Sequence, residues 1–146
     1  MKKIEKFTGK YRFLSNFFIC FPNFIVYNNR KFRSVEHAFQ AAKCANDNDM
    51  DLFMIVDKPE DAKSLGNSVK LREDWEKVKV SIMKECVRQK FSYPKLKSML
   101  LETGDAVLVE GNHWGDTFWG VCKGEGQNNL GKILMEIRDE FRKEKS

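Results

Sequence analysis

Residues 34–43 carry a clear helical pattern, and they read Ser34-Val35-Glu36-His37-Ala38-Phe39-Gln40-Ala41-Ala42-Lys43. Ser34 is suited to an N-cap, because its hydroxyl can accept a hydrogen bond from a backbone N–H in the first helical turn. Four apolar residues then recur at the spacing of one helix face: Val35, Ala38, Phe39 and Ala42. The stretch therefore predicts a helix that starts after Ser34 and buries one side in a core.

Three polar residues share another side of this predicted helix. Glu36, Gln40 and Lys43 lie within about 40° of one another on a helical wheel, so they form one column of carboxylate, amide and ammonium. The column lies beside the apolar face, where its groups would be half-buried at the lip of a pocket. The same spacing also fits a solvated stripe with a weak ion pair. The pattern alone leaves both interpretations open.

The rest of the chain reads as short strands followed by helices. Strands are predicted at residues 17–21, 24–27 and 106–109, with a hairpin turn at Asn28-Asn29. Helices are predicted at residues 50–55, 59–65, 75–91, 94–101 and 129–142, and Gly66 is the predicted stop of the second. The sequence therefore predicts an α+β fold: a mostly helical single domain over residues 1–146 with a small antiparallel sheet.

Composition limits the classes of protein and ligand. The chain has 146 residues, 42% of them hydrophobic and including 12 Phe, so a sizeable core is available and extensive disorder is excluded. The net charge of +5 is a mild excess. It suits an anionic ligand such as a phosphate and permits weak nucleic-acid affinity, without establishing either.

Targeting segments and metal motifs are not apparent in the sequence. No apolar run approaches the roughly 20 residues of a membrane span, and no signal peptide is visible, so a cytoplasmic protein without a membrane partner is predicted. The four cysteines are too widely spaced for a zinc or redox pair, which favours reduced thiols. His37 and His113 lack metal-ligand spacing, so neither a metal nor another cofactor is predicted.

Two glycine-rich segments near the C-terminus are candidates for ligand binding. Residues 111–120 place two tryptophans and Asp116 among glycines, which is unusual for a plain surface loop, and long loops of this kind are often functional. Residues 124–131 lead into the last predicted helix, where a glycine-rich entry can bind an anion. Simple helix capping by Asn128 explains the second segment equally well.

Two earlier features also have alternative interpretations. Trp75, at the start of the longest predicted helix, fits either a core anchor or a stacking platform for a flat base. Ser15 and Asn16 lie between aromatic residues, where they fit either an ordinary turn or polar contacts in an aromatic pocket.

Together these segments resemble the YbiA/NADAR family from about residue 7 to residue 141. The matching stretches, in order, are Phe13-Leu14-Ser15-Asn16-Phe17, residues 34–43, Leu65-Gly66, residues 71–79, Lys90-Phe91, residues 108–110, residues 116–120, residues 126–131 and residues 134–138. The most specific parts are SVEHAFQAAK and the C-terminal NNLGKILMEIR. The order and spacing of so many matches make chance agreement very improbable.

The resemblance implies metal-independent N-glycosidase chemistry. Family members are associated with hydrolysis of the base–ribose bond in ribosylaminopyrimidine phosphates, which are early riboflavin intermediates. The family's catalytic Glu, Trp and Asp correspond here to Glu36, Trp75 and Asp116. In this hypothesis Glu36 activates water, Asp116 assists the leaving group or the water, and Trp75 with Trp119 frames the base; the two carboxylates could exchange roles. The implied substrate contacts are Phe13, Ser15, Asn16, Gln40, Lys43, Trp119, Gly120 and Asn128.

The resemblance also leaves two alternative functions open, and the chain departs from the family pattern at one position. Some family members remove ADP-ribose from guanine bases in DNA, which makes ADP-ribosylated DNA the alternative substrate. A non-catalytic module that binds ADP-ribose or NAD is the alternative of another class, although both carboxylates are retained here. Many members carry a basic residue after the Leu-Gly pair, where this chain has Asn67, and this puts substrate identity in doubt more than reaction type. The expected partner is a phosphorylated nucleotide-like molecule, and no oligomeric state is predicted.

Overall fold

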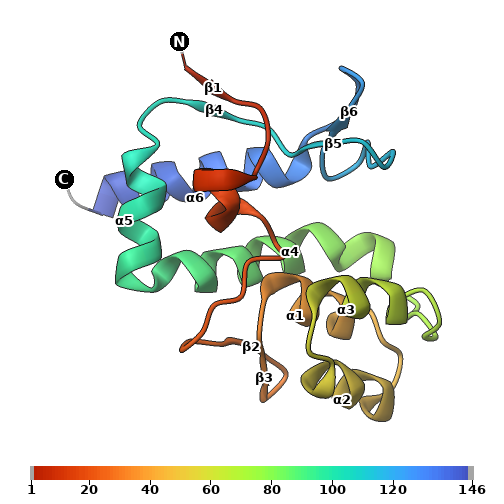
Figure 1. Cartoon of the computed structure of the whole chain (residues 1–146). Coiled ribbons are helices and arrows are strands. Elements are labelled where there is room, and N and C mark those ends of the chain that lie inside the picture. Colours follow the sequence, from red (N-terminus) through yellow and green to blue (C-terminus); the bar gives the residue numbers. More distant parts are fainter. Residues whose placement is uncertain (1, 145–146) are drawn as a thin grey trace. The chain divides into compact units, whose positions relative to one another are not determined.

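The computed structural model describes residues 2–144, and these fall into two compact units (Figure 1). The first unit takes the N-terminal segment as far as Ser15 and the C-terminal part from Phe91 onward. The second unit is the continuous stretch Asn16–Lys90.

The second unit contains the predicted hairpin. Strands β2 (Ile25–Tyr27) and β3 (Arg30–Phe32) pair in antiparallel fashion, with Val26 opposite Lys31. Asn28 and Asn29 both have positive φ values, 50° and 62°, as a two-residue hairpin turn requires. The side-chain amide of Gln89 covers the outer edge of β2: it accepts from Val26 N (2.8 Å) and donates to Val26 O (2.7 Å). The amide thus satisfies backbone groups that would otherwise be open to another strand.

The strand predicted at residues 17–21 is absent, and that prediction was wrong. Cys20 N donates to Arg33 O (2.9 Å), but Cys20 O closes a turn by accepting from Asn23 N (2.8 Å). The turn contains Pro22, which has no backbone N–H to offer a ladder. The aromatic and β-branched side chains that suggested a strand are partly solvent-exposed, and Phe21 is 84% exposed.

Four helices make up the rest of this unit: α1 (Val35–Ala42), α2 (Asp47–Ile55), α3 (Pro59–Leu65) and α4 (Trp75–Ser92), whose last two residues belong to the first unit. Ser34 Oγ caps α1 by accepting from His37 N (3.2 Å), as predicted. Helix α2 begins before the predicted residue 50, because Asn46 Oδ1 caps it by accepting from Asp49 N (2.9 Å). All eight residues of α1 are buried, and α1 packs against α2 and α3.

The first unit holds two short parallel strand pairs and two helices. Strand β1 (Lys3–Ile4) pairs with β4 (Val107–Leu108), and β5 (Gly111–Asn112) pairs with β6 (Val121–Cys122). The other elements are the 3₁₀ helix η1 (Gly9–Leu14), α5 (Pro94–Glu102) and α6 (Asn129–Glu144). The parallel pairs were not predicted, but the α+β class with mostly helical content is confirmed.

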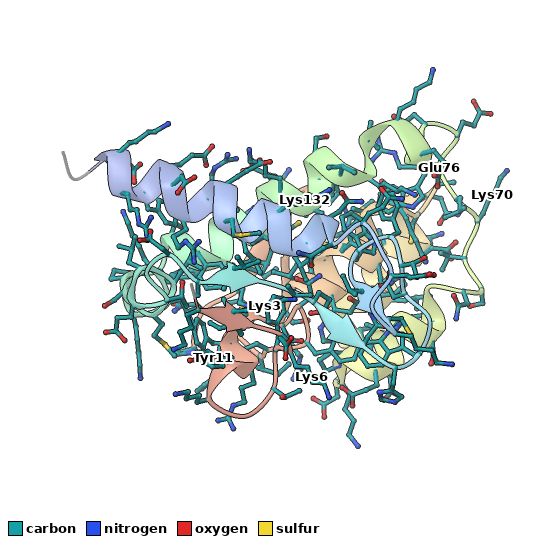
Figure 2. All side chains as sticks on the ribbon, turned by 90° about the horizontal axis from the view of Figure 1, so that it is seen from above. Lys3, Lys6, Tyr11, Lys70, Glu76 and Lys132 are labelled. Carbon is teal, nitrogen blue, oxygen red and sulfur yellow. The ribbon has the colours of Figure 1, made fainter. Side chains whose placement is uncertain are left out.

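The N-terminal segment of this unit carries polar groups into solvent. Lys3 and Lys6 are exposed and Tyr11 is half-buried, on β1, η1 and the segment between them (Figure 2). The ammonium of Lys2 donates to the Tyr11 hydroxyl (2.8 Å), which lowers the pKa of the phenol. No helix within residues 2–144 combines the length and apolar character that a bilayer crossing needs.

The four cysteines are free and buried. Burial raises the pKa of Cys44 to about 11 and that of Cys86 to about 12. Both thiols therefore stay protonated at neutral pH, as expected of small hydrophobic residues in a core.

Candidate active site

The predicted site residues are divided between the two units. The second unit contains Asn16, Glu36, Gln40, Lys43 and Trp75. The first unit contains Phe13, Ser15, Asp116, Trp119, Gly120 and Asn128. Each group is built by its own local structure.

The polar column on α1 is a buried feature of the second unit and not a solvated stripe. Glu36 and Gln40 are each only 7% exposed, and Lys43, the C-cap of the helix, is half-buried. Gln40 Nε2 donates to Glu36 Oε2 at 2.7 Å. The column is therefore buried, which is against the solvated-stripe interpretation, and its first two members lie deeper than the half-buried position expected.

Lys43 is electrostatically linked to Glu36. Burial lowers the pKa of Lys43, while the negative charge of Glu36 acts in the opposite direction. The ammonium is thus partly desolvated, and the negative charge of Glu36 offsets part of the cost of that burial.

Gly66 allows the end of α3 to approach this column. A Cβ at this position would stand 2.9 Å from Lys43 Nζ and closer still to Gln40 Oε1. The φ of Gly66 is −59°, an ordinary right-handed value, so the glycine is not required by a left-handed turn. It ends α3 as predicted, but the physical reason for a glycine here is the close approach.

Trp75 is held against α1 by the segment that precedes α4. Arg72 N donates to Lys43 O (2.9 Å), and the Arg72 guanidinium bonds Asp74 (Nε to Oδ1, 2.6 Å) and the Tyr27 hydroxyl (3.1 Å). Trp75 follows directly, 7% exposed, with its ring centroid 5.0 Å from that of Phe39. Burial favours the core-anchor interpretation, and the ring contact places the indole against Phe39, which lies on the helix that carries Glu36.

The neighbours of Trp75 in sequence behave differently. Lys70 and Glu76, labelled in Figure 2, are both exposed and project away from the protein. The segment therefore turns one large aromatic side chain inward between solvated charges.

Asn16 supports the start of α1 through its backbone. Its carbonyl accepts from Glu36 N at 3.0 Å, and its side-chain Nδ2 lies 3.4 Å from the Met83 sulfur. Asn16 thereby fixes the position of the helical turn that carries Glu36.

In the first unit, Asp116 organises the turn that leads to Trp119. Its Oδ1 accepts from Phe118 N (3.1 Å) and Trp119 N (2.9 Å). The Asn112 side chain holds Asp116 in turn, accepting from Asp116 N (3.0 Å) and donating to Asp116 O (2.9 Å) and Val121 O (3.3 Å). Both of these backbone hydrogen bonds use Oδ1 of the Asp116 carboxylate, and neither uses Oδ2.

Asn128 joins the start of α6 to β4. Its φ is 55°, its Oδ1 accepts from Glu110 N (2.9 Å) and its Nδ2 donates to Leu108 O (2.9 Å). The amide does not cap α6; it binds the strand, and both of its polar atoms have protein partners. Gly120 is buried close by, where a Cβ would overlap the carbonyl of Glu110.

Phe13 and Ser15 belong to the end of η1. Phe13 is 5% exposed and its ring stands 6.4 Å from that of Phe91, in an edge-to-face arrangement. Ser15 is half-buried and donates its N–H to Arg12 O (3.0 Å). These two side chains therefore occupy a packed turn.

Two residues that support the site were not singled out from the sequence. Asn112, within the glycine-rich loop, is the hub of the turn around Asp116, and Arg72 fixes the approach to Trp75. For Asn112, the sequence offers one signal: an Asn four residues before an Asp in a glycine-rich loop is typical of a turn held by side-chain hydrogen bonds. Arg72 has no local signal, because its partners Tyr27 and Ala42 are distant in sequence.

Comparison with known families gives a clear match. The model of the NADAR domain matches residues 4–142. The chain belongs to the NADAR domain family. The resemblance found in the sequence is therefore confirmed. No group of three or more His, Cys, Asp or Glu side chains placed to hold a metal occurs among residues 2–144 of this NADAR domain.

Several named proteins are similar to this NADAR domain. N-glycosidase Npun_R5314 of Nostoc punctiforme is 39% identical over 134 residues, covering 84% of this chain and 85% of its own. N-glycosidase YbiA of Escherichia coli is 38% identical over 114 residues, covering 75% and 71%. The chloroplastic riboflavin biosynthesis protein PYRR of Arabidopsis thaliana is 46% identical over 96 residues, which are 60% of this chain and 16% of PYRR. The NMR structure of E. coli YbiA has a TM-score of 0.83 and 32% identity, covering 99% of this chain and 89% of YbiA.

Proposed function

We propose that this protein is an N-glycosidase that hydrolyses the bond between a base and a ribose in a phosphorylated nucleotide-like molecule. The observation that carries this proposal is the buried Glu36 carboxylate, bonded to Gln40, coupled to Lys43 and placed on the helix that packs against Trp75. The names of the relatives from Nostoc punctiforme and E. coli support the same activity.

The proposed chemistry assigns one role to each of the three groups. Cleavage of the C1′–N bond builds positive charge on the ribose, and a buried carboxylate such as Glu36 stabilises that charge and takes a proton from the attacking water. The departing base receives a proton with assistance from Asp116. In this proposal the indole of Trp75, which lies against Phe39, holds the base, and Trp119 contributes a second aromatic surface. Exchange of the roles of Glu36 and Asp116 leaves the overall reaction unchanged.

We propose a ribosylaminopyrimidine phosphate as the substrate class. The similarity to PYRR supports this class, and Lys43 offers a cation for the phosphate. Asn67, which follows Gly66, contributes no charge. Lys43 is therefore the proposed phosphate ligand, and the protein needs no metal for the reaction.

A direct comparison of substrates tests this function. Purified protein is incubated with a ribosylaminouracil phosphate and, separately, with an oligonucleotide that carries ADP-ribosylated guanine. Base release from the first is expected. Release of ADP-ribose from the second alone would favour action on DNA. Activity on neither, together with calorimetric binding of ADP-ribose, would favour a non-catalytic module.

Lys43→Arg is expected to leave kcat/KM for the phosphorylated substrate within about tenfold of the unmodified protein at neutral pH, because the cation is retained. The alkaline limb of the pH profile should change more. Burial lowers the pKa of Lys43 from its ordinary 10.5, so phosphate affinity in the unmodified protein falls as pH rises towards that value. Arginine keeps its charge over this range, so the limb should disappear. The measurement is kcat/KM from pH 6 to pH 10.

Lys43→Met is the matched variant without charge, and its KM for the phosphorylated substrate should rise while kcat changes less.

The lowered pKa of Lys43 also favours a different use of this amine, as a nucleophile that bonds to C1′ while the base leaves with the bonding electrons and a proton. Opening of the ribose then gives an imine, which water hydrolyses. Abolished turnover in Lys43→Arg, with a borohydride-stabilised adduct on the unmodified protein, would replace the phosphate role by this one.

A further inference from the structure

The orientation of the Gln40 amide is fixed by its partner. Glu36 is a carboxylate and can only accept, so the nitrogen of the amide has to face Glu36 Oε2, at 2.7 Å. The oxygen of the amide then points the other way. Gln40 Oε1 is buried and has no hydrogen-bond partner among residues 2–144.

A buried acceptor without a partner costs free energy, so its presence has to be explained by another constraint. A Leu or Met in the place of Gln40 would avoid this cost in a helix whose eight residues are all buried. The contact that an apolar residue cannot make is the bond from Nε2 to Glu36. The unpartnered oxygen is thus a consequence of directing the nitrogen at the carboxylate.

Gly66 supplies the space for this arrangement. Any Cβ at the end of α3 would overlap the oxygen of the Gln40 amide and crowd Lys43 Nζ. Since the backbone of Gly66 has a φ of −59°, alanine would be tolerated there by the backbone and opposed by the side chains of Gln40 and Lys43. The absence of a side chain at Gly66 and the position of the Gln40 amide therefore depend on each other, and we call the two residues the Gln40–Gly66 device.

Three segments of the second unit contribute groups around the Gln40–Gly66 device. Lys43 at the end of α1 is an ionisable group that interacts with Glu36, and the end of α3 contributes the uncharged Gly66 at the contact. The segment before α4 contributes Trp75 against Phe39, with its Arg72 guanidinium already bonded to Asp74 and Tyr27. The amide of Gln40 is thus a neutral donor to the carboxylate, near the Lys43 ammonium of the same helix.

We propose, on the basis of the N-glycosidase function above, that Gln40 is a positioning residue for Glu36 and that Gly66 provides the space this role requires. The amide holds the carboxylate in one rotamer and favours its ionised form by donating to it. Any side chain at position 66 displaces the amide and releases the carboxylate. A change at Gln40 alters substrate affinity little, because in this proposal the amide acts on Glu36 and not, as the family resemblance implied, on the ligand.

Gln40→Met is expected to lower kcat by about 10- to 100-fold with KM within about threefold, because a positioned base is lost while the volume of the side chain is kept. The acidic limb of the kcat profile should move to higher pH by about one unit, since the ionised carboxylate loses a donor. Gly66→Ala should likewise lower kcat and move the acidic limb of the kcat profile to higher pH. Ser64→Ala, at an exposed position of α3, is the matched control and should change neither.

Gln40→Glu provides a conservative test of the donor itself. The new carboxyl can donate to Glu36 only while it holds a proton, and two neighbouring carboxyls share one proton over a range of pH. Turnover should therefore be recovered at mildly acidic pH and fall as pH rises, where the unmodified protein has a plateau. A purely structural role for Gln40 predicts no such reversal.

A second readout separates this inference from the proposed function. The side-chain carboxyl carbon of Glu36 is followed by NMR through a pH titration in the unmodified protein, Gln40→Met and Gly66→Ala, without any substrate. A higher titration midpoint in Gln40→Met supports the positioning role even if the protein releases no base from any substrate tested. An unchanged midpoint and an unchanged acidic limb in Gln40→Met would overturn it, whether or not Gly66→Ala folds.

Discussion

Glu36→Gln is expected to lower kcat for base release by about 10²- to 10⁴-fold, the usual contribution of a positioned acid or base. The substitution removes the charge and keeps the shape. The new amide oxygen can still accept from Gln40 Nε2, so the bond seen at 2.7 Å can persist and α1 should fold as before. Substrate binding should persist, because the variant loses only the group that acts on water and on the developing ribose cation. Steady-state kcat and KM, with calorimetric binding of the product, measure the effect.

Glu76→Gln is the matched control for this loss. Glu76 is exposed at the start of α4 and pairs with Lys79 at 2.6 Å, so its substitution removes the same charge from the same unit and should leave kcat unchanged. Turnover by Glu36→Gln within about tenfold of the unmodified protein would mean that Glu36 is not the general base. Asp116 would then be the remaining carboxylate for that role.

Local sequence patterns predicted the elements of the second unit well. Ser34 identified the start of α1, and the Asn28-Asn29 pair identified the hairpin, because caps and tight turns are set by residues next to one another. The same kind of signal was ambiguous for residues 17–21. A run of aromatic and β-branched residues indicates a strand only when a partner ladder is available, and the turn at Asn23 prevents it.

Pairings between distant segments were beyond local patterns. β1 and β4 are separated by about a hundred residues, and a parallel pair has no turn signal to reveal it. The two parallel pairs were therefore missed, while the buried strand near Val107 was recognised from its apolar run. The role of Gly66 was likewise unreadable, since its neighbours Gln40 and Lys43 lie on another helix.

The candidate site shows the same division between local and distant information. Helical spacing grouped Glu36 with Gln40, and the structure bonds them. Helical spacing could not predict that these side chains are buried. A polar column at the edge of an apolar face can be exposed to solvent, and here the end of α3 lies against it. The family resemblance selected Glu36, Trp75 and Asp116, and the assignment of chemistry to these three remains a proposal.

Asp116 combines a structural and a proposed chemical role, and two substitutions separate them. Its Oδ1 accepts from the backbone of Phe118 and Trp119, a function that the amide oxygen of asparagine reproduces. Its ionisable carboxyl group is what the proposed reaction uses. Asparagine therefore tests the carboxyl group, and alanine tests the carboxyl group and the turn together.

Asp116→Asn is expected to lower kcat by about 100-fold or more with the thermal midpoint of unfolding nearly unchanged, because the turn before Trp119 keeps its acceptor while the carboxyl group is lost. Asp116→Ala should lose at least as much activity and also about 1–2 kcal/mol of stability, the usual cost of removing a side-chain acceptor from two backbone N–H groups. Amide hydrogen exchange of Phe118 and Trp119 should rise in the alanine variant alone, since only there do these N–H groups lose their partner. Asp139→Asn, at an exposed position of α6, is the control for loss of a charge in the same unit. Full activity in Asp116→Asn, together with loss of activity in Asp116→Ala, would reduce Asp116 to a residue that shapes the turn, and Glu36 would then carry the acid–base chemistry without a second carboxylate.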